Sequence, residues 1–344
     1  MANGGGPRHH EGVMRRRAFL ALSLAAAAGA AVTERAFSHD LAAARQRLAG
    51  RSRLVRTRFG QIEVAEAGDG PPVLMVHGTG GGFDQALAFA APLAAHGWRV
   101  IAPSRIGYLR SAYPPGATPA TEADGFADLL DALAIDRVPI IGGSAGAQPA
   151  IEFAIRHPDR CSALVALVPA AFAPGRPPVR PPTPLAQAII DHGLKSDFLF
   201  WAGMTVAQDA MIGALLATDP ALVRAAAPAE QARARAILRD ILPVSDRARG
   251  FAHDARFAAD PPPQALELIT VPTLAVSLED DRFETAAAAR HIAASVQGAE
   301  LILYPTGGHI WIGRQAALLA AVDDFLRRAG AAAAGAAESA EGRT

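Results

Sequence analysis

The feature that most constrains the fold of this chain is a regular alternation of short apolar runs with longer segments of helical spacing. Apolar runs at residues 73–77, 98–103, 138–142 and 163–168 are separated by stretches in which apolar residues recur every three or four positions. Parallel strands need a crossover connection, usually a helix, so this alternation is typical of βαβ units. We predict an α/β protein with an eight-stranded, mostly parallel sheet flanked by helices.

The alternation stops between residues 173 and 263. This stretch is rich in proline at first and then carries helical patterns without a strand signal. We predict that it forms a helical cap inserted into a core made of residues 51–172 and 264–328. Residues 329–344 contain no large apolar side chain, which predicts a disordered tail.

Residues 1–50 have the pattern of a leader. Three arginines, Arg15 to Arg17, precede a run of roughly 15 apolar residues, a length that fits an export signal better than a membrane span. The string at 16–20 resembles the twin-arginine motif R-R-x-F-L. We predict export to the periplasm. Two alternatives stay open, an uncleaved membrane anchor and an N-terminal helix without a targeting role in a cytoplasmic protein.

Composition excludes several classes of function. The chain has 33 basic and 33 acidic residues, and its basic residues form no stripe interleaved with aromatics, so we expect no nucleic-acid partner. A single cysteine, Cys161, cannot form an internal disulfide or a cysteine-based zinc cluster, and we expect it to be a buried packing residue. None of the ten histidines has the helical spacing of a metal site. We therefore predict no metal site. No sequence pattern predicts an oligomeric state.

The strongest chemical motif is Gly-Gly-Ser-Ala-Gly at residues 142–146. It fits G-x-S-x-G and lies between a predicted strand and a predicted helix, the setting in which this pattern presents a nucleophilic serine on a sharp turn. Ser144 would also lie at a helix N-terminus, where free amides and the helix dipole favour developing negative charge. A purely structural turn is the alternative, and the strand-turn-helix setting disfavours it.

Three further motifs follow predicted strands. His-Gly-Thr-Gly-Gly-Gly occupies 77–82, Leu-Glu-Asp-Asp-Arg-Phe occupies 278–283, and Thr-Gly-Gly-His occupies 306–309. A serine hydroxyl needs a base to accept its proton, and histidine has a suitable ordinary pKa. The glycine-rich loop does not have the spacing of a phosphate-binding loop, which argues against a nucleotide site.

These motifs together resemble the α/β-hydrolase fold superfamily, in the branch whose members carry a lid. The resemblance covers about residues 54–328. It implies a cofactor-free serine hydrolase with Ser144 as the nucleophile, His309 as the general base and Asp281 as the acid that orients the histidine. The backbone amides of Thr79 and Ala145 would form the oxyanion hole.

The choice of acid stays open at this point. Members of the superfamily usually carry a glycine where Leu278 stands, with the acid three residues later, which points to Asp281. Asp280 and Glu279 are the alternatives. The competing histidine is His77, which in the resembling loop is structural.

Weaker features of the sequence agree with this assignment. Residues 104–111 resemble the superfamily's D-x-x-G-x-G-x-S loop without its leading acid and second glycine, and Arg105 and Arg110 would either attract an anionic substrate or be solvated. An apolar cluster in the cap would roof an acyl pocket or only pack against the core. Its members are Phe198, Phe200, Trp201 and Met204. We expect Trp311 to be a core residue.

The resemblance implies a small-molecule ester as substrate and a carboxylesterase as activity. The same mechanism also serves carbon–carbon bond hydrolases, thioesterases, lactonases, aminopeptidase-like enzymes and cofactor-free perhydrolases. A binding protein that kept the fold without catalysis is the alternative from another class, and the filled triad positions disfavour it.

Overall fold

The computed structural model describes residues 31–176, 192–258 and 260–341 of the 344-residue chain. Contacts divide the chain into two units, Met1–Arg47 and Leu48–Thr344. The described residues of the first unit, 31–47, are helical, and the helix ends at residue 48. The twin-arginine-like string at 16–20 lies outside the described residues, and the export prediction stays a prediction.

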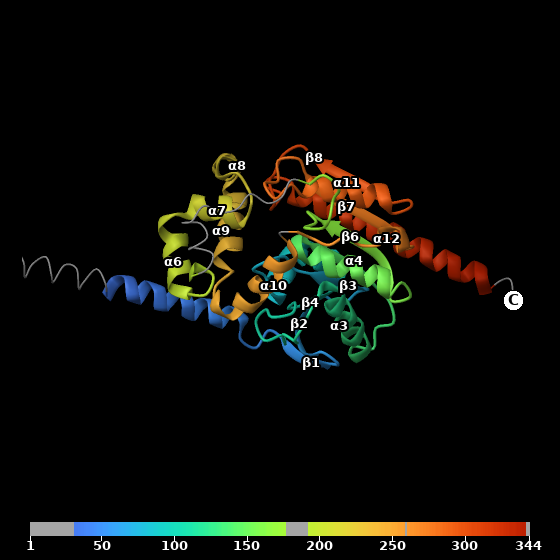
Figure 1. Cartoon of the computed structure of the whole chain (residues 1–344), viewed down its shortest axis with the longest axis horizontal. Coiled ribbons are helices and arrows are strands. Elements are labelled where there is room, and N and C mark those ends of the chain that lie inside the picture. The colour runs from blue at the N-terminus through green and yellow to red at the C-terminus, as the bar shows by residue number, and fades with distance from the viewer. Residues whose placement is uncertain (1–30, 177–191, 259, 342–344) are drawn as a thin grey trace, which may run out of the picture. The chain divides into compact units, whose positions relative to one another are not determined.

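An eight-stranded sheet forms the centre of the second unit (Figure 1). Its strand order is β1-β2-β4-β3-β5-β6-β7-β8. The β1–β2 and β2–β4 pairs are antiparallel, and the other pairs are parallel. The strands are β1 (Arg53–Thr57), β2 (Gly60–Ala67), β3 (Pro72–Val76), β4 (Arg99–Pro103), β5 (Val138–Gly143), β6 (Cys161–Leu167), β7 (Thr273–Leu278) and β8 (Glu300–Tyr304). The predicted fold class is confirmed.

Helices cover both faces of this sheet. Successive side chains of β3 alternate between two apolar clusters: Leu74 and Val76 pack in one, Val73 and Met75 in the other. Burial on both faces explains why the strands read as continuous apolar runs. The first cluster includes side chains of α3 (Pro119–Ala132), α4 (Ala147–Arg156) and α11 (Thr285–Ser295), and the second includes side chains of α2 (Phe83–Ala95) and α12 (Gln315–Glu341).

Between β6 and β7 the described residues form helices and no strand. The first of these helices is apolar on all sides, with Phe200, Trp201 and Met204 buried, whereas Phe198 is 41% exposed. Figure 1 shows the first four grouped together in yellow to orange. The five helices described here are α6 (Asp197–Val206), α7 (Gln208–Leu215), α8 (Pro220–Ala225), α9 (Pro228–Arg239) and α10 (Ala248–Ala258).

The described helices are short or interrupted by charged residues. Within these residues, no single helix has both the length and the apolar composition needed to cross a bilayer. The α6–α7 pair, bent by 113°, meets the criterion when its two helices are taken together.

The C-terminus differs from the prediction of a disordered tail over 329–344. Helix α12 continues to Glu341, and only 342–344 lie outside the described residues. Alanine has the highest intrinsic helix propensity, so an alanine-rich stretch can extend a helix without large apolar side chains to anchor it. The absence of large apolar residues was therefore the wrong signal for the backbone conformation here.

Candidate active site

Ser144 occupies a strained turn between β5 and α4. Its φ angle is +52°, in the left-handed region that non-glycine residues rarely adopt. The turn passes close to the end of β3: a Cβ atom at Gly146 would lie 2.4 Å from the carbonyl oxygen of His77. Only glycine fits there, which gives the last position of the G-x-S-x-G motif a physical reason. The side chain of Ser144 is only partly buried.

Ser144, His309 and Asp281 form one hydrogen-bonded chain. The Oγ atom of Ser144 lies 2.9 Å from Nε2 of His309, and Nδ1 of His309 lies 2.8 Å from Oδ2 of Asp281. A neutral imidazole that donates from Nδ1 to the carboxylate accepts the serine proton at Nε2. The three residues come from different elements, the β5–α4 turn, the segment after β8 and the turn after β7. The arrangement can transfer a proton from a nucleophile to a base.

The two adjacent aspartates make different contacts. Asp280 accepts hydrogen bonds from the amides of Gly307 and Gly308, at 3.1 Å and 2.8 Å, and so shapes the loop that carries the histidine. Asp281 is the one that meets the imidazole. Glu279 instead pairs with Arg290. Strand β7 continues through Leu278, which is buried, so the turn forms after the position where the superfamily usually has glycine.

Asp281 is held in its ionised form. Burial alone would raise the pKa of this carboxyl, but the neighbouring imidazole of His309 and the hydrogen bonds from Thr285 and the amide of Phe283 outweigh burial, so the pKa is lowered. Thr285 had not been singled out from the sequence. Its place four residues after Asp281, at the start of α11, was the available signal.

The glycine-rich loop after β3 lies against the nucleophile. A Cβ atom at Gly78 would meet the Cβ atom of Ser144 at 2.9 Å. The backbone amides of Thr79 and Ala145 donate to no other described residue, and Thr79 is exposed. Two amides without an internal partner therefore belong to segments that meet at Ser144, and they can bind an anionic oxygen there.

His77 has a structural environment and cannot compete with His309 for the proton of Ser144. Its Nε2 accepts a hydrogen bond from the amide of Arg105 at 2.9 Å, and its Nδ1 donates to the carbonyl of Gly78 at 2.7 Å. Complete burial, followed by the nearby positive charge of Arg105, lowers the pKa of His77 to about 3. The ring is neutral, and its two nitrogens are engaged by backbone groups of Gly78 in the same loop and of Arg105 in the loop after β4.

The interpretation of Arg105 as an entrance or solvated residue was wrong. Its side chain is buried and forms ion pairs with Glu122 at 3.2 Å and Asp254 at 2.8 Å. Arg110 is about half exposed but pairs with Glu63 at 2.6 Å. Neither arginine is an uncompensated charge at the site.

Two aromatic residues surround the segment that carries His309. Phe283 packs edge-on against the imidazole, with ring centroids 5.0 Å apart, and is 36% exposed. Trp311 is buried against Phe89, as expected for a core residue. Cys161 is likewise buried. Phe283 therefore presents a partly exposed aromatic ring beside the imidazole.

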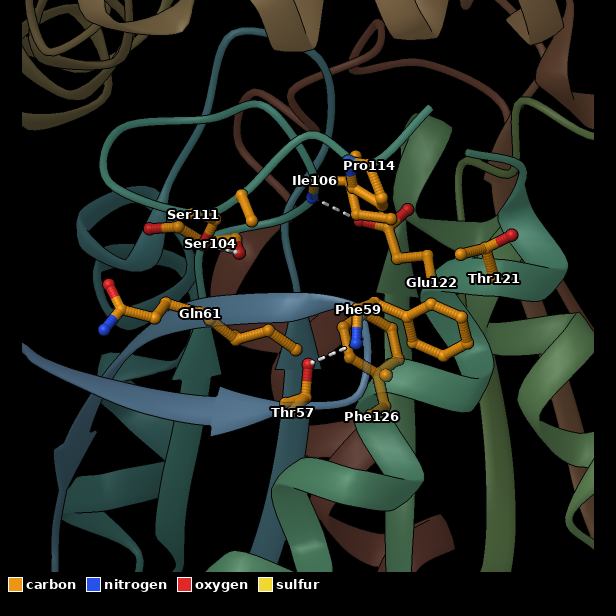
Figure 2. A pocket seen from close by; sticks show the side chains of 13 residues that line it. Thr57, Phe59, Gln61, Ser104, Ile106, Ser111, Pro114, Thr121, Glu122 and Phe126 are labelled. Atoms are coloured by element: carbon orange, nitrogen blue, oxygen red, sulfur yellow. Dashed lines mark hydrogen bonds between the residues drawn. The ribbon is translucent and has the colours of Figure 1, made fainter. Parts of the chain in front are cut away.

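Neither of two cavities contains the hydrogen-bonded chain. The first, of about 20 Å³, lies between the β1–β2 hairpin and α3 beside Glu122 (Figure 2), and it has room for little more than one water molecule. The second, of about 480 Å³, is lined by residues at the starts of β3 and β5, including Pro72 and Pro139. It therefore lies at the sheet edge opposite to Ser144. Within the described part of the chain, no group of three or more potential metal ligands occurs.

Comparisons with known proteins agree with this geometry. The sequence model of the family described as alpha/beta hydrolase fold matches residues 71–312. A 2-hydroxy-6-oxononadienedioate/2-hydroxy-6-oxononatrienedioate hydrolase from Paraburkholderia xenovorans (strain LB400) is 29% identical over 271 residues, covering 76% of this chain and 90% of that protein.

Solved structures show the same architecture. An alpha/beta hydrolase fold protein from Nakamurella multipartita superposes with a TM-score of 0.62 and 27% identity, covering 81% of this chain and 99% of that one. The enol-lactonase from Burkholderia xenovorans LB400 has a TM-score of 0.61 at 22% identity, over 80% of this chain and 100% of its own, and this likeness concerns the fold alone.

Proposed function

Since this chain belongs to the α/β-hydrolase fold family and is a hydrolase, we propose that it cleaves carboxylic esters through an acyl-enzyme formed on Ser144. The observation that carries the proposal is the continuous hydrogen-bonded chain from Ser144 through His309 to Asp281, with the serine on a strained turn. A binding protein without catalysis would have no use for this alignment.

The first half of the reaction forms the acyl-enzyme. Nε2 of His309 takes the proton of Ser144 while Oγ attacks the ester carbonyl carbon. The carbonyl oxygen becomes an anion, which the amides of Thr79 and Ala145 stabilise. The imidazolium then gives its proton to the leaving alcohol as the C–O bond breaks. Ionised Asp281 stabilises the imidazolium throughout.

The second half releases the acid. His309 removes a proton from a water molecule, whose oxygen attacks the acyl carbon. The tetrahedral intermediate uses the same two amides. It collapses with return of the proton to Ser144, so the enzyme is regenerated and one water has been consumed per ester bond.

A neutral substrate suits the charges around the site. Both arginines that had been considered for an anionic substrate are already paired with carboxylates, and Arg105 is buried. Phe283 adds an apolar surface next to the histidine. We therefore favour esters of small or medium, largely apolar acids.

Carbon–carbon bond hydrolysis is the second candidate. It is favoured by the similarity along 90% of a relative whose named substrate is a dienedioate, a dicarboxylate. One described cation suits such a substrate. Arg176 donates to the carbonyl of Phe283 at 2.9 Å and forms no ion pair with a described carboxylate. Serine, histidine and the two amides would serve this reaction as well.

A probe and a substrate panel test the proposal. We expect a fluorophosphonate probe to label the wild type and not Ser144→Ala. We also expect p-nitrophenyl esters of short acyl chains to be turned over, with kcat/KM lowered by about 10⁴-fold or more in Ser144→Ala. Ser295→Ala is the matched control, because among the described residues its hydroxyl contacts His291 and no residue of the site.

The outcomes separate the candidates. An unlabelled wild type would overturn the hydrolase mechanism in favour of a binding protein. A labelled wild type that cleaves the relative's dienedioate at least tenfold more efficiently than every ester would replace the ester proposal with the carbon–carbon one.

A further inference from the structure

Asp254, in cap helix α10, is a buried carboxylate with four hydrogen-bond contacts to the core. Its Oδ2 accepts from the hydroxyls of Thr79 at 2.8 Å and Tyr108 at 2.7 Å and from Nη1 of Arg105 at 3.1 Å, and its Oδ1 accepts from Nη2 of Arg105 at 2.8 Å. Only 2% of the residue is exposed. A single cap residue thus meets the glycine-rich loop and the loop after β4.

The partners of Asp254 hold the same glycine-rich loop at further points. The hydroxyl of Tyr108 accepts a hydrogen bond from the amide of Gly80 at 3.2 Å. The amide of Arg105 donates to the ring of His77. Groups that Asp254 orients therefore hold His77 and Gly80, which lie on either side of Thr79. The backbone amide of Thr79 itself donates to no described residue.

The buried charges around Asp254 compensate one another. Arg105 lies between two carboxylates, Asp254 and Glu122, all three fully buried. Burial tends to raise the pKa of Asp254, but Arg105 and the hydroxyl donors outweigh burial and lower the pKa, so the carboxyl accepts all its hydrogen bonds as an anion. The pKa of Glu122 is raised by burial, against the influence of Arg105.

We propose that Asp254 is a positioning residue, which aims the amide of Thr79 at the oxyanion by holding the hydroxyl of the same residue. This rests on the proposed function of Ser144 and the two amides. The cap then contributes to the chemical step, because one of its helices sets the geometry of an oxyanion donor. The contribution is made in the transition state, where the oxygen carries its charge.

Asp254→Asn tests the role, with Glu122→Gln as the matched control. Both changes remove one carboxylate from Arg105, but Glu122 contacts neither Thr79 nor Tyr108. We expect Asp254→Asn to lower kcat for a p-nitrophenyl ester by about 10- to 100-fold, with KM changed less than about threefold. We expect Glu122→Gln to lose less than about threefold in kcat.

A second readout does not depend on turnover. Hydrogen exchange followed by mass spectrometry on the peptide covering 77–84 should be about tenfold faster in Asp254→Asn than in wild type, and unchanged in Glu122→Gln. Thr79→Val serves if Asp254→Asn does not fold, since it removes only the hydroxyl. It should show the same loss of kcat, and adding it to Asp254→Asn should cause little further loss.

The proposal would be overturned if Asp254→Asn and Glu122→Gln had equal effects on kcat and on hydrogen exchange of the 77–84 peptide. Asp254 would then act only by pairing with Arg105, as Glu122 does. Unchanged exchange in both Asp254→Asn and Thr79→Val would overturn it as well. A wild type that no fluorophosphonate labels would refute the proposed function instead, and the exchange comparison would still decide whether Asp254 holds the loop.

Discussion

Asp280 and Asp281 are neighbours in sequence with separate tasks. Asp280 accepts two loop amides, and Asp281 meets the imidazole of His309. An aspartate with two acceptor oxygens can hold two amides at once, whereas an asparagine oxygen replaces only part of that capacity. The same substitution at the two positions should therefore have different consequences.

We predict that Asp281→Asn lowers kcat by about 10⁴-fold with its fold retained, because the wrong imidazole tautomer is then favoured. Asp280→Asn should lower kcat by less than about tenfold and cost about 1 kcal/mol of unfolding free energy, through loss of one amide contact. Steady-state kinetics on an ester and urea unfolding of both variants measure these effects. The reverse ranking of the two kcat values would show that Asp280 orients the base.

The sequence motifs named residues that the structure brings into one hydrogen-bonded chain, but the environment of Arg105 could not be inferred from spacing. Ser144, His309 and Asp281 lie next to strand ends, and the ends of parallel strands meet at one sheet edge, so sequence order is informative. Arg105 was misjudged because its partner Asp254 is 149 residues away. No local pattern shows that two charges so far apart will be buried together.

At the scale of elements, strands were more predictable than cap helices. Strands buried on both faces read as apolar runs. Helix α10 lies inside the predicted helical cap, but its mixture of charged and apolar residues did not show which of its side chains would be buried against the core. In helix α12 the prediction failed in the other direction, because a segment predicted to be disordered is helical. Its alanine content favours a helix even though large apolar residues are missing. Among the side chains of α12 that the structure describes, the last large buried one is Leu326, followed by buried Ala329.

Removal of residues 332–344 should therefore have little effect on stability. We expect the melting temperature to change by less than about 2 °C. A longer deletion that starts at Val322 should prevent folding, because it also removes Phe325 and Leu326 from the second apolar cluster. Thermal unfolding followed by circular dichroism compares the two. A large destabilisation by the shorter deletion would mean that the end of α12 packs on the core.

For the whole molecule, acid stability depends on histidines that are buried in neutral form. Burial, then the charge of Arg105, lowers the pKa of His77 to about 3 and that of His253 to about 4, from an ordinary value of 6.5. Between these values the unfolded chain binds a proton at each ring and the folded chain does not. The free energy of unfolding must then fall as pH falls, by up to about 1.4 kcal/mol per pH unit for each histidine.

We predict that His253→Phe makes this loss shallower between pH 6 and pH 4.5, by roughly 1 kcal/mol per pH unit. Neither ring nitrogen of His253 has a hydrogen-bond partner, so the change sacrifices no such bond. His39→Phe is the control, since 83% of that side chain is exposed. Urea unfolding over this pH range measures the slopes. An unchanged slope in His253→Phe would show that His253 is protonated in the folded protein.

The cap and the core are joined by two buried charge pairs of opposite polarity. Arg247 of the cap meets Asp84 of the core, at 2.9 Å, and Asp254 of the cap meets Arg105 of the core. A buried charge left without its partner costs several kcal/mol. A chimera that receives its cap from a relative would remove Arg247 from Asp84 and would leave Arg105 with Glu122 but without Asp254, unless the graft supplied a base and an acid at the matching places. Substrate specificity can therefore be exchanged by cap transplantation only from donors whose caps carry an arginine and an aspartate at the positions of Arg247 and Asp254. Otherwise the graft must also change their core partners, Asp84 and Arg105.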